Sequence, residues 1–484
     1  MPKVYLSKVT KHTIFIRTDL YLLDLKSKKP LHIQLYEALK EEITSQYNIG
    51  DKLPSIRKIA SEYSLSKTTV ESAYSQLYAE GYIESRPKSG YFVSELYFDT
   101  FNQKKEPINE SETSSKIYKY DFFPAQLSSD TFPFKLWKRL YTKTINDSLD
   151  LGAYHDGQGE LGLRQEIAKY LIASRGVKCH VQQIVICSGF SDAMGLLAKL
   201  IRNRYTHFGI ENPGYHVARR VFEEYGYSIE KIVVDAQGLQ LTALKKSKAK
   251  LVYITPSHQY PTGVTMPVSH RLKLLEYIQK VDGLIIEDDY DSELAYNNRP
   301  IPALQGLDNY DCVVYMGTFA KSLSPALRLS YMVLPNHLLP EYKQSYDAHF
   351  PRVSLMTQKT LEAFISGGHW DKHVRKIRTL NKKKHNLMLK LFKEQLGDTY
   401  KILSQGGGLA ILIMPSVPFD WEKFHLLLEE YSIKVYLAKE RCGGEFEALR
   451  MGFGGFSEEE LEEAIEVFSN IWEICIITIL NKHT

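Results

Sequence analysis

Short apolar runs recur along the chain after about residue 119, and they constrain its fold more than any other feature. Stretches of helical periodicity separate these runs, which are rich in Val, Ile, Leu and Tyr. Such alternation is typical of an α/β domain with a mainly parallel sheet. The clearest predicted strands are residues 184–187, 207–210, 251–254, 284–286, 313–316 and 329–333.

Nearly every one of these predicted strands runs into a segment that contains a glycine, a proline or an acidic residue. In an open α/β sheet, ligands bind at the carboxyl ends of the strands. We therefore expect the chemistry of this domain at those ends.

Residues 317–328 carry one lysine, Lys321, among small residues. Thr318 lies three positions before it and Arg328 seven positions after it. A partly desolvated lysine near positive charge forms Schiff bases readily. We expect Arg328 to supply such charge and to be able to pair with a phosphate. The alternative is an ordinary turn with a solvated lysine.

Residues 284–290 lead from an apolar strand into a run of acids. With a period of two, Asp288 and Tyr290 project to one side while Glu287 and Asp289 project to the other. A carboxylate beside a phenol suits the ring nitrogen and the hydroxyl of one flat heteroaromatic molecule. The alternative is a set of solvated acids at the start of a loop.

A predicted anion site follows the strand at 184–187, where Ser188, Gly189 and Phe190 open a helix. Backbone N–H groups and the helix dipole attract anions there. Together with Thr318 and Arg328, this turn is expected to hold a phosphate monoester. Tyr215, just beyond another strand, is placed to stack on a flat ring.

The region from residue 30 to 94 has a different, helical pattern. Its third predicted helix begins near Ser66, with Lys67, Thr68 and Thr69 at the end that a recognition helix presents to base edges. A predicted hairpin after it exposes cations toward a phosphate backbone or a minor groove. Residues 26–95 hold ten Lys or Arg against nine Asp or Glu, so charge alone leaves a protein-interaction module as an equal alternative.

Composition sets the remaining bounds. A formal net charge of +4 over 484 residues gives no sign of bulk nucleic-acid or membrane binding. Five scattered cysteines favour neither a disulfide framework nor a metal site, so a reducing cytoplasm is expected. The apolar tail is too short to span a bilayer. The predicted organisation is an N-terminal extension (1–25), a helical domain (26–94), a flexible linker (95–118) and an α/β domain (119–484).

Five motifs in the helical domain resemble, in order and spacing, the winged helix-turn-helix of the GntR family. They are PLHIQLY (30–36), GDKLPSIR (50–57), SKTTV (66–70), LYAEGYI (77–83) and SGYFV (89–93). Lys67 stands where an arginine is common in that family. The resemblance implies binding to double-stranded DNA through Arg57, Ser66, Lys67, Thr68, Thr69, Arg86, Lys88, Ser89 and Gly90.

The α/β domain resembles the fold-type I pyridoxal 5'-phosphate enzymes of the aminotransferase class, which have a smaller C-terminal α+β subdomain. The resemblance implies a Schiff base between Lys321 and the cofactor, with Asp288 at the pyridine nitrogen and Tyr290 at the ring hydroxyl. It further implies that Tyr215 stacks on the ring and that Ser188, Gly189, Phe190, Thr318 and Arg328 surround the phosphate. In LRMGFG (449–454), Arg450 corresponds to the arginine that grips an amino acid's α-carboxylate. Tyr260 stands where aminotransferases commonly have an asparagine.

The combination of both domains resembles the MocR/GabR subfamily of transcriptional regulators. It implies a head-to-tail homodimer that senses an amino acid or related amine through aldimine exchange at Lys321, with little or no turnover. Two alternatives stay open: an active aminotransferase, and a regulator that senses pyridoxal phosphate itself.

Overall fold

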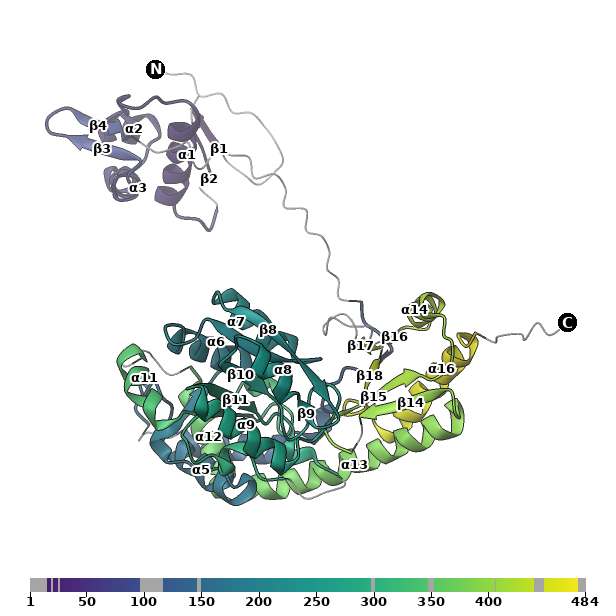
Figure 1. Ribbon diagram of the computed structural model, residues 1–484. Helices are drawn as coiled ribbons and strands as arrows, with labels where there is room; N and C mark the ends of the chain where they lie inside the picture. The colour runs from purple at the N-terminus through teal and green to yellow at the C-terminus, as the bar shows by residue number, and fades with distance from the viewer. Residues whose placement is uncertain are drawn as a thin grey trace. The chain divides into compact units, whose positions relative to one another are not determined.

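The structure is a computed structural model, and the chain divides into two compact units, residues 1–115 and 116–484. Figure 1 shows their helices and strands. The residues described are 15–18, 21–24, 27–95, 116–145, 149–296, 301–346, 352–404, 406–438 and 448–477.

The first unit is a winged helix-turn-helix. Its helices are α1 (Leu31–Ser45), α2 (Ile56–Glu62) and α3 (Lys67–Ala79), and its wing pairs β3 (Ile83–Arg86) with β4 (Gly90–Val93) in antiparallel register. Leu35, Leu39, Val70 and Leu77 are buried in its core because they recur on one face of each helix. Ser55 and Ser66 cap α2 and α3 by accepting backbone N–H groups.

The predicted N-terminal extension contains a short hairpin, formed by β1 (Phe15–Thr18) and β2 (Tyr21–Asp24). Leu23 of β2 is buried in the core of the winged helix. The Asp24 N–H donates to Gln34 Oε1 of α1 at 2.9 Å, so this hairpin is joined to the DNA-binding unit. Residues 1–14, 19–20 and 25 of the extension, and residues 96–115 of the predicted linker, lie outside the described residues.

The second unit is built on a mixed sheet with the order β6-β13-β12-β11-β10-β7-β8-β9. Its strands are β6 (Ile184–Cys187), β7 (His207–Asn212), β8 (Ser228–Asp235), β9 (Gly238–Leu239), β10 (Leu251–Ile254), β11 (Leu284–Asp288), β12 (Val313–Thr318) and β13 (Ser330–Val333). The predicted α/β fold class is therefore confirmed. Strand β11 extends past the predicted end at residue 286, because pairing with β12 continues as far as Asp288.

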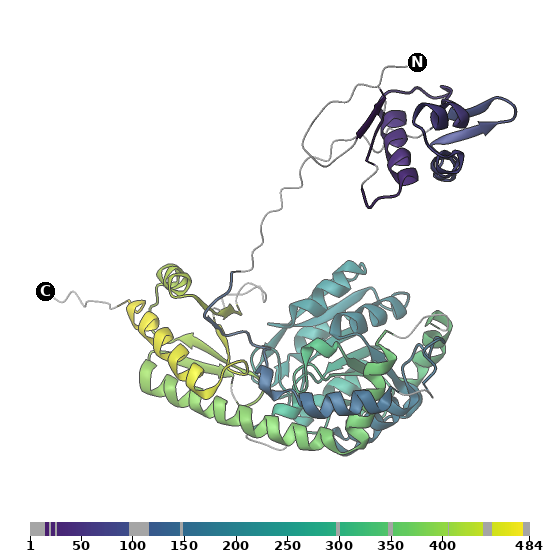
Figure 2. The ribbon, with the colours of Figure 1, turned by 180° about the vertical axis from the view of Figure 1, so that it is seen from behind.

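Helices lie on both faces of this sheet (Figure 2). On one face, Leu251 and Tyr253 of β10 pack in a core shared with α6 (Phe190–Leu200), α7 (His216–Glu224) and α11 (Leu339–Tyr346). On the other face, Val252 and Ile254 pack near α8 (Leu241–Lys246), α9 (Val268–Lys280) and α10 (Leu304–Leu307). Successive residues of a strand thus point to opposite faces of the sheet and pack into two different cores.

One strand departs from the parallel arrangement. β13 pairs antiparallel with both β12 and β6. Its N-terminal end therefore lies at the same edge as the carboxyl ends of its neighbours. This direction brings Arg328, which precedes β13, to that edge.

A smaller lobe follows the sheet, as predicted for the C-terminal part of the chain. It pairs β14 (Tyr400–Ser404), β15 (Ala410–Pro415), β18 (Leu449–Gly452) and β17 (Tyr436–Leu437), beside α14 (Trp421–Glu430) and α16 (Glu458–Ile474). The short strand β5 (Tyr120–Asp121) pairs with β16 (Ile433–Lys434), so the segment after the linker belongs to this lobe.

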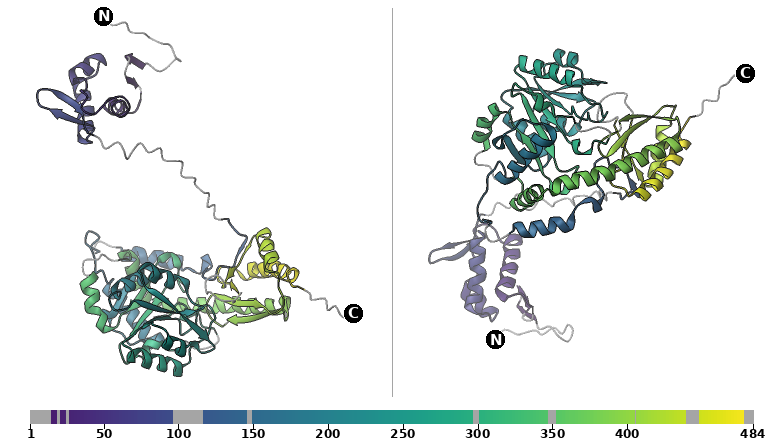
Figure 3. Two further views of the ribbon diagram at one scale, coloured as in Figure 1. Left: turned by 45° about the horizontal axis from the view of Figure 1, so that its top comes forward. Right: turned by 90° about the horizontal axis from the view of Figure 1, so that it is seen from below.

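Helix α13 (His369–Leu396) runs beneath both lobes (Figure 3). Trp370 and Val374, near its start, pack with α4 (Phe134–Thr144), α5 (Leu161–Arg175) and α12 (Leu355–Ser366) in a core on the second face of the sheet. Met388 and Phe392, further along α13, pack in the core of the small lobe. A single helix therefore contributes to both cores. Among the described residues, no helix is long and apolar enough to cross a bilayer.

A buried ion pair fixes the end of β11. Arg175 Nε donates to Asp289 Oδ2 at 2.6 Å and Arg175 Nη2 donates to Asp289 Oδ1 at 3.1 Å. The Tyr315 hydroxyl of β12 donates to the same carboxylate at 2.6 Å. The Asp289 charge is thus satisfied by two partners, as a buried carboxylate requires.

We expect Arg175→Met to lower the free energy of unfolding of the second unit by about 3–5 kcal/mol, because it leaves the Asp289 carboxylate buried without its cation. Urea unfolding followed by tryptophan fluorescence measures this, since Trp137, Trp370, Trp421 and Trp472 all lie in the second unit. Lys390→Met is the control, because Lys390 pairs with Glu394 at 3.9 Å on the surface and should change stability by at most about 1 kcal/mol. Equal effects of both substitutions would contradict the buried pair's role.

Candidate functional site

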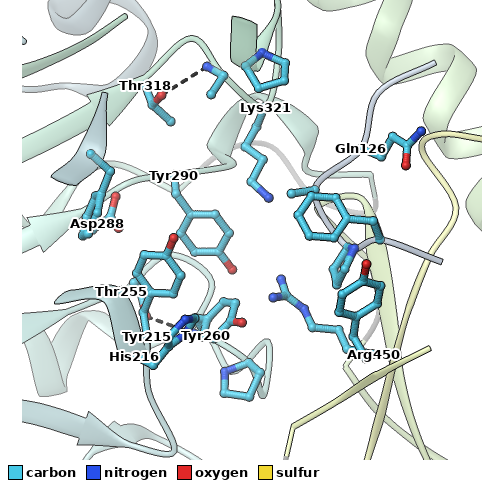
Figure 4. Close-up of a pocket in the computed structure, with 18 of the residues that line it drawn as sticks. Gln126, Tyr215, His216, Thr255, Tyr260, Asp288, Tyr290, Thr318, Lys321 and Arg450 are labelled. Carbon is cyan, nitrogen blue, oxygen red and sulfur yellow. Dashed lines mark hydrogen bonds between the residues drawn. The ribbon is translucent and has the colours of Figure 1, made fainter. Parts of the chain in front are cut away.

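A cavity of about 750 Å³ opens in the second unit at the edge where the strands of the large sheet end. Its walls come from the large sheet and from the small lobe, which contributes residues 123–127, 434–438 and Arg450. Figure 4 shows Lys321, Asp288, Tyr290 and Arg450 directed into this space. Residues that are far apart in sequence therefore meet in one site.

Lys321 lies just beyond β12 and is half-buried against the cavity. Burial lowers its pKa to about 7, and the nearby Arg450 charge acts in the same direction. Asp291 and Asp288 oppose this shift and offset only part of it. A lysine with such a pKa has a large neutral fraction near pH 7, which is the nucleophilic form.

Asp288 ends β11 and is buried, with its Oδ2 accepting a hydrogen bond from the Tyr253 hydroxyl at 2.5 Å. Burial raises the pKa of Asp288 to about 7. Tyr290 lines the same cavity. Glu287, on the other side of the strand, instead accepts the backbone N–H groups of Leu304 and Gln305. Asp288 and Tyr290 therefore line the cavity while Glu287 lies on the other side of the strand, as the period-two pattern predicts.

The Tyr290 hydroxyl has a partner that sequence reasoning missed. It lies 3.3 Å from His258 Nδ1, and that nitrogen lies 2.7 Å from Asp291 Oδ2. Burial lowers the pKa of His258, but the Asp291 carboxylate outweighs it and the net shift is upward.

The predicted anion site joins the start of α6 to Arg328. Gly189 and Phe190, with Thr318 and Arg328, line the cavity, whereas Ser188 does not. The Ser188 N–H donates to Asp192 Oδ2 at 2.8 Å, within its own helix turn. Of the predicted phosphate ligands, four are therefore brought together and one lies outside the cavity wall.

Gly189 allows this convergence. Its φ is +83°, and a Cβ placed there would lie 2.4 Å from Arg328 Nη2. Arg328 itself has a φ of +47°, in the left-handed region. Among the described residues, no carboxylate pairs with its guanidinium. An arginine held over a helix N-terminus with no acid beside it is suited to an anion from outside the chain.

Tyr215 and Arg450 also line the cavity. The Tyr215 ring meets Phe190 edge-on at 5.2 Å and Tyr260 edge-on at 5.1 Å. Arg450, in β18, has its guanidinium carbon 4.1 Å from the centroid of the Tyr260 ring. Within the described part of the chain, no carboxylate lies within ion-pair distance of it.

The predicted DNA contacts lie on the first unit. Arg57, Lys67 and Thr68 are exposed, as are the wing residues Arg86, Lys88, Ser89 and Gly90. Ser66 caps α3 by accepting the Thr69 N–H at 3.1 Å, so these two residues shape the helix start. Lys67 pairs with Glu71 at 3.1 Å on the exposed surface, an ion pair of little energetic weight.

Two family models match the chain. "Bacterial regulatory proteins, gntR family" covers residues 31–93, and "Aminotransferase class I and II" covers residues 125–468. The chain is 36% identical to the HTH-type transcriptional regulator YdeL of Bacillus subtilis, over 92% of this chain and 97% of that protein. It is 34% identical to the probable rhizopine catabolism regulatory protein MocR of Rhizobium meliloti, over 81% and 83%.

The chain belongs to the MocR/GabR type of GntR-family transcriptional regulators. The second unit has the fold of an aminotransferase, since it is similar to a kynurenine aminotransferase of Pyrococcus horikoshii with a TM-score of 0.67. That likeness covers 75% of this chain and 92% of the aminotransferase at 24% identity, so it speaks for the fold alone. The family resemblance drawn from the sequence is confirmed.

The aminotransferase fold of this family implies pyridoxal 5'-phosphate, and the cavity residues fit it. Gly189, Phe190, Thr318 and Arg328 would hold the phosphate, where the missing Cβ of Gly189 leaves room beside the guanidinium. Lys321 supplies a primary amine and Asp288 a buried carboxyl. This donor set matches a phosphorylated, electron-withdrawing aldehyde.

Other parts of the cavity were not predicted from the sequence. They include His216, Tyr253, Thr255 and Ser330 from the large sheet and residues 123–127 and 434–438 from the small lobe. Thr255 and His216 follow strands, so the rule that placed Tyr215 points to them as well. Residues 123–127 carry no such signal, because only the pairing of β5 with β16 brings them to the site.

We expect the reactivity of Lys321 toward a limiting amount of acetic anhydride to rise through about pH 7 in the cofactor-free protein. The reason is that its lowered pKa makes the amine neutral above that pH. Peptide mass spectrometry measures this, with solvated lysines in the same digest as the reference. Arg450→Gln should move the midpoint upward, since it removes a positive charge. A wild-type midpoint equal to that of the solvated lysines would contradict the assignment.

Proposed function

We propose that this regulator senses an amino acid, or a related amine, at Lys321 and converts its presence into altered binding of double-stranded DNA. The observation that carries the proposal is the pair of basic side chains, Lys321 and Arg450, that line one cavity. Lys321 is held near neutrality, and Arg450 has no acid partner among the described residues. An effector with both an amine and a carboxylate matches both residues: its amine would take the place of the Lys321 amine, and its carboxylate would pair with Arg450.

When bound, pyridoxal 5'-phosphate supplies a carbonyl carbon that primary amines attack. Arg328 and the start of α6 would hold its phosphate, and Tyr215 would pack against its ring. Asp288 would keep a proton on the ring nitrogen, for which a buried carboxylate is suited. Arg450 would bind the effector's carboxylate and so orient its amine toward the position that Lys321 occupies.

The link to DNA rests on the two lobes that wall the cavity. Helix α13 packs into the cores of both lobes. If the two lobes close on an effector, the resulting movement would therefore be transmitted through α13 to the other elements of the second unit. Different affinities of an effector for two arrangements of the lobes would then shift the DNA-binding state.

We further propose that the regulator is a head-to-tail homodimer in the cytoplasm, where its operator is found. Exposed large apolar side chains of the second unit, from α4 to the start of α5, support a dimer. Phe134 is 72% exposed and Tyr154 is 80% exposed, with Leu151 and Leu161 also exposed. Exposed apolar side chains of this size support an interface with a second copy of the chain. Two winged helices would read two half-sites.

Turnover as an aminotransferase is the second candidate, since the cavity holds an amine, a ring-nitrogen partner and a carboxylate clamp. Tyr260 disfavours it, because it stands where aminotransferases commonly have an asparagine. Sensing therefore agrees better with the winged helix and with this substitution.

We expect the absorbance of the cofactor-loaded protein to change on titration with at least one member of a panel of amino acids and amines. The same compound should alter operator binding in a gel shift, because one site serves both. Lys321→Ala, which lacks the amine, should show neither the wild-type spectrum nor the response. Sensing at Lys321 would be refuted if no compound changed the absorbance of the wild type, or if Lys321→Ala kept the wild-type spectrum. Multiple turnovers with an added keto acid would favour the aminotransferase reading.

We expect Arg57→Ala and Lys67→Ala each to weaken binding to DNA from the chain's own upstream region. If either side chain contacts phosphate, its loss should reduce the slope of log affinity against log salt by about 1. Gel shifts at several salt concentrations measure both quantities. Lys401→Ala, an exposed lysine of β14, is the charge-matched control in the other unit. Wild-type affinity in both winged-helix variants would exclude this DNA interface.

A further inference from the structure

The contact between Tyr260 and Arg450 has no part in the function proposed above. The guanidinium carbon lies over the aromatic ring, 4.1 Å from its centroid. Both side chains are half-buried and line the cavity. Figure 4 shows the guanidinium lying beside the Tyr260 ring, within reach of the open space. The ring therefore forms one side of the arginine's surroundings.

A ring holds an arginine in a different way from an acid. The electron-rich face attracts the cation but accepts none of its N–H hydrogens in the way a carboxylate does. A carboxylate partner would occupy the donors that a ligand needs. The contact with Tyr260 thus restrains Arg450 while leaving those donors available.

Tyr260 is itself held in place. Its backbone N–H donates to Thr255 Oγ1 at 3.0 Å, and the Thr255 hydroxyl donates to Glu211 Oε2 at 2.8 Å. Its ring packs edge-on against Tyr215 at 5.1 Å and against Tyr290 at 6.3 Å. Because both its backbone and its ring are fixed, Tyr260 is a rigid support.

The charges around Arg450 make such a support necessary. The Arg450 charge adds to burial in lowering the pKa of Lys321, and it also opposes protonation of His258. Asp291, the nearest acid to His258, is already bound to that imidazole at 2.7 Å. Without the ring, the arginine keeps its repulsive neighbours and loses the contact that restrains it.

We infer that Tyr260 is a specificity-determining residue, which positions Arg450 so that the regulator selects molecules with a free carboxylate over the amines that lack one. This inference rests on the proposed function, because it concerns the same cavity. It names the effector class as amino acids rather than amines. Tyr260 acts through Arg450 and is a positioning residue.

The test compares matched pairs of compounds on the full-length, cofactor-loaded protein. Each pair is an amino acid and the amine that remains without its carboxyl group: L-alanine with ethylamine, L-phenylalanine with phenethylamine, and γ-aminobutyrate with propylamine. Absorbance titration gives each affinity. The variants are Tyr260→Leu and Tyr260→Asn, which remove the ring, and Tyr260→Phe, which keeps it.

We expect both ring-removing variants to bind the amino acid of a pair about 3- to 30-fold more weakly than the wild type, as loss of a cation–π contact predicts. The amine should bind within about twofold of wild type, and Tyr260→Phe should retain wild-type selectivity. Equal losses for both members of a pair would mean a merely structural role and would overturn the inference. Unchanged selectivity in whichever ring-removing variant folds would overturn it as well.

A compound with a carboxylate but no amine, such as propionate, tests this inference independently of the proposed function. If the wild type binds none of the six compounds, sensing by amines at Lys321 fails. Calorimetric titration with propionate then decides the role of Tyr260. About 3- to 30-fold weaker propionate binding in Tyr260→Leu or Tyr260→Asn would support it. Equal binding, or no binding to the wild type, would overturn it.

Discussion

The buried pair of Arg175 and Asp289 is the interaction on which the site depends. It satisfies the Asp289 carboxylate, which follows β11 and faces away from the cavity, with Tyr315 as its second partner. Because side chains alternate along a strand, fixing Asp289 on one face also fixes Asp288 and Tyr290 on the other. Glu287 is held in the same way by the backbone of α10. Buried acids that are fully paired give the strand end one conformation.

Charge inside the cavity follows from that arrangement. Asp288 is buried against Tyr253, and its pKa rises because water is excluded. Lys321 is desolvated in the same space and faces Arg450, so its pKa falls. The cavity thus contains an acid with a raised pKa, a lysine with a lowered pKa and two arginines without acid partners among the described residues. Such imbalance within a folded protein indicates sites for charged ligands rather than for structural ion pairs.

Sequence reasoning located most of this machinery. Lys321, Asp288, Tyr290 and Arg328 were found because strand ends carry function, and period-two alternation assigned Asp288 and Tyr290 to one face. The Ser188 N–H donates to Asp192 Oδ2, so a contact of Ser188 with the phosphate stays a prediction. It assigned no contact to His258, and it noted Tyr260 only as a departure from the asparagine that aminotransferases commonly have. Their contacts to Asp291 and Arg450 join positions 33 and 190 residues apart, and no local pattern encodes such distances.

The sequence by itself determined the winged helix, the α/β class, the family and the residue types of the site. These features depend on local periodicity, on capping and on short motifs, all of which are properties of neighbouring residues. The tertiary structure alone decided three other features. They are the antiparallel direction of β13 that brings Arg328 to the cavity, the contribution of residues 123–127 through β5, and the contact of Tyr260 with Arg450. Each depends on which elements pack side by side, and that choice is made by burial across the whole unit.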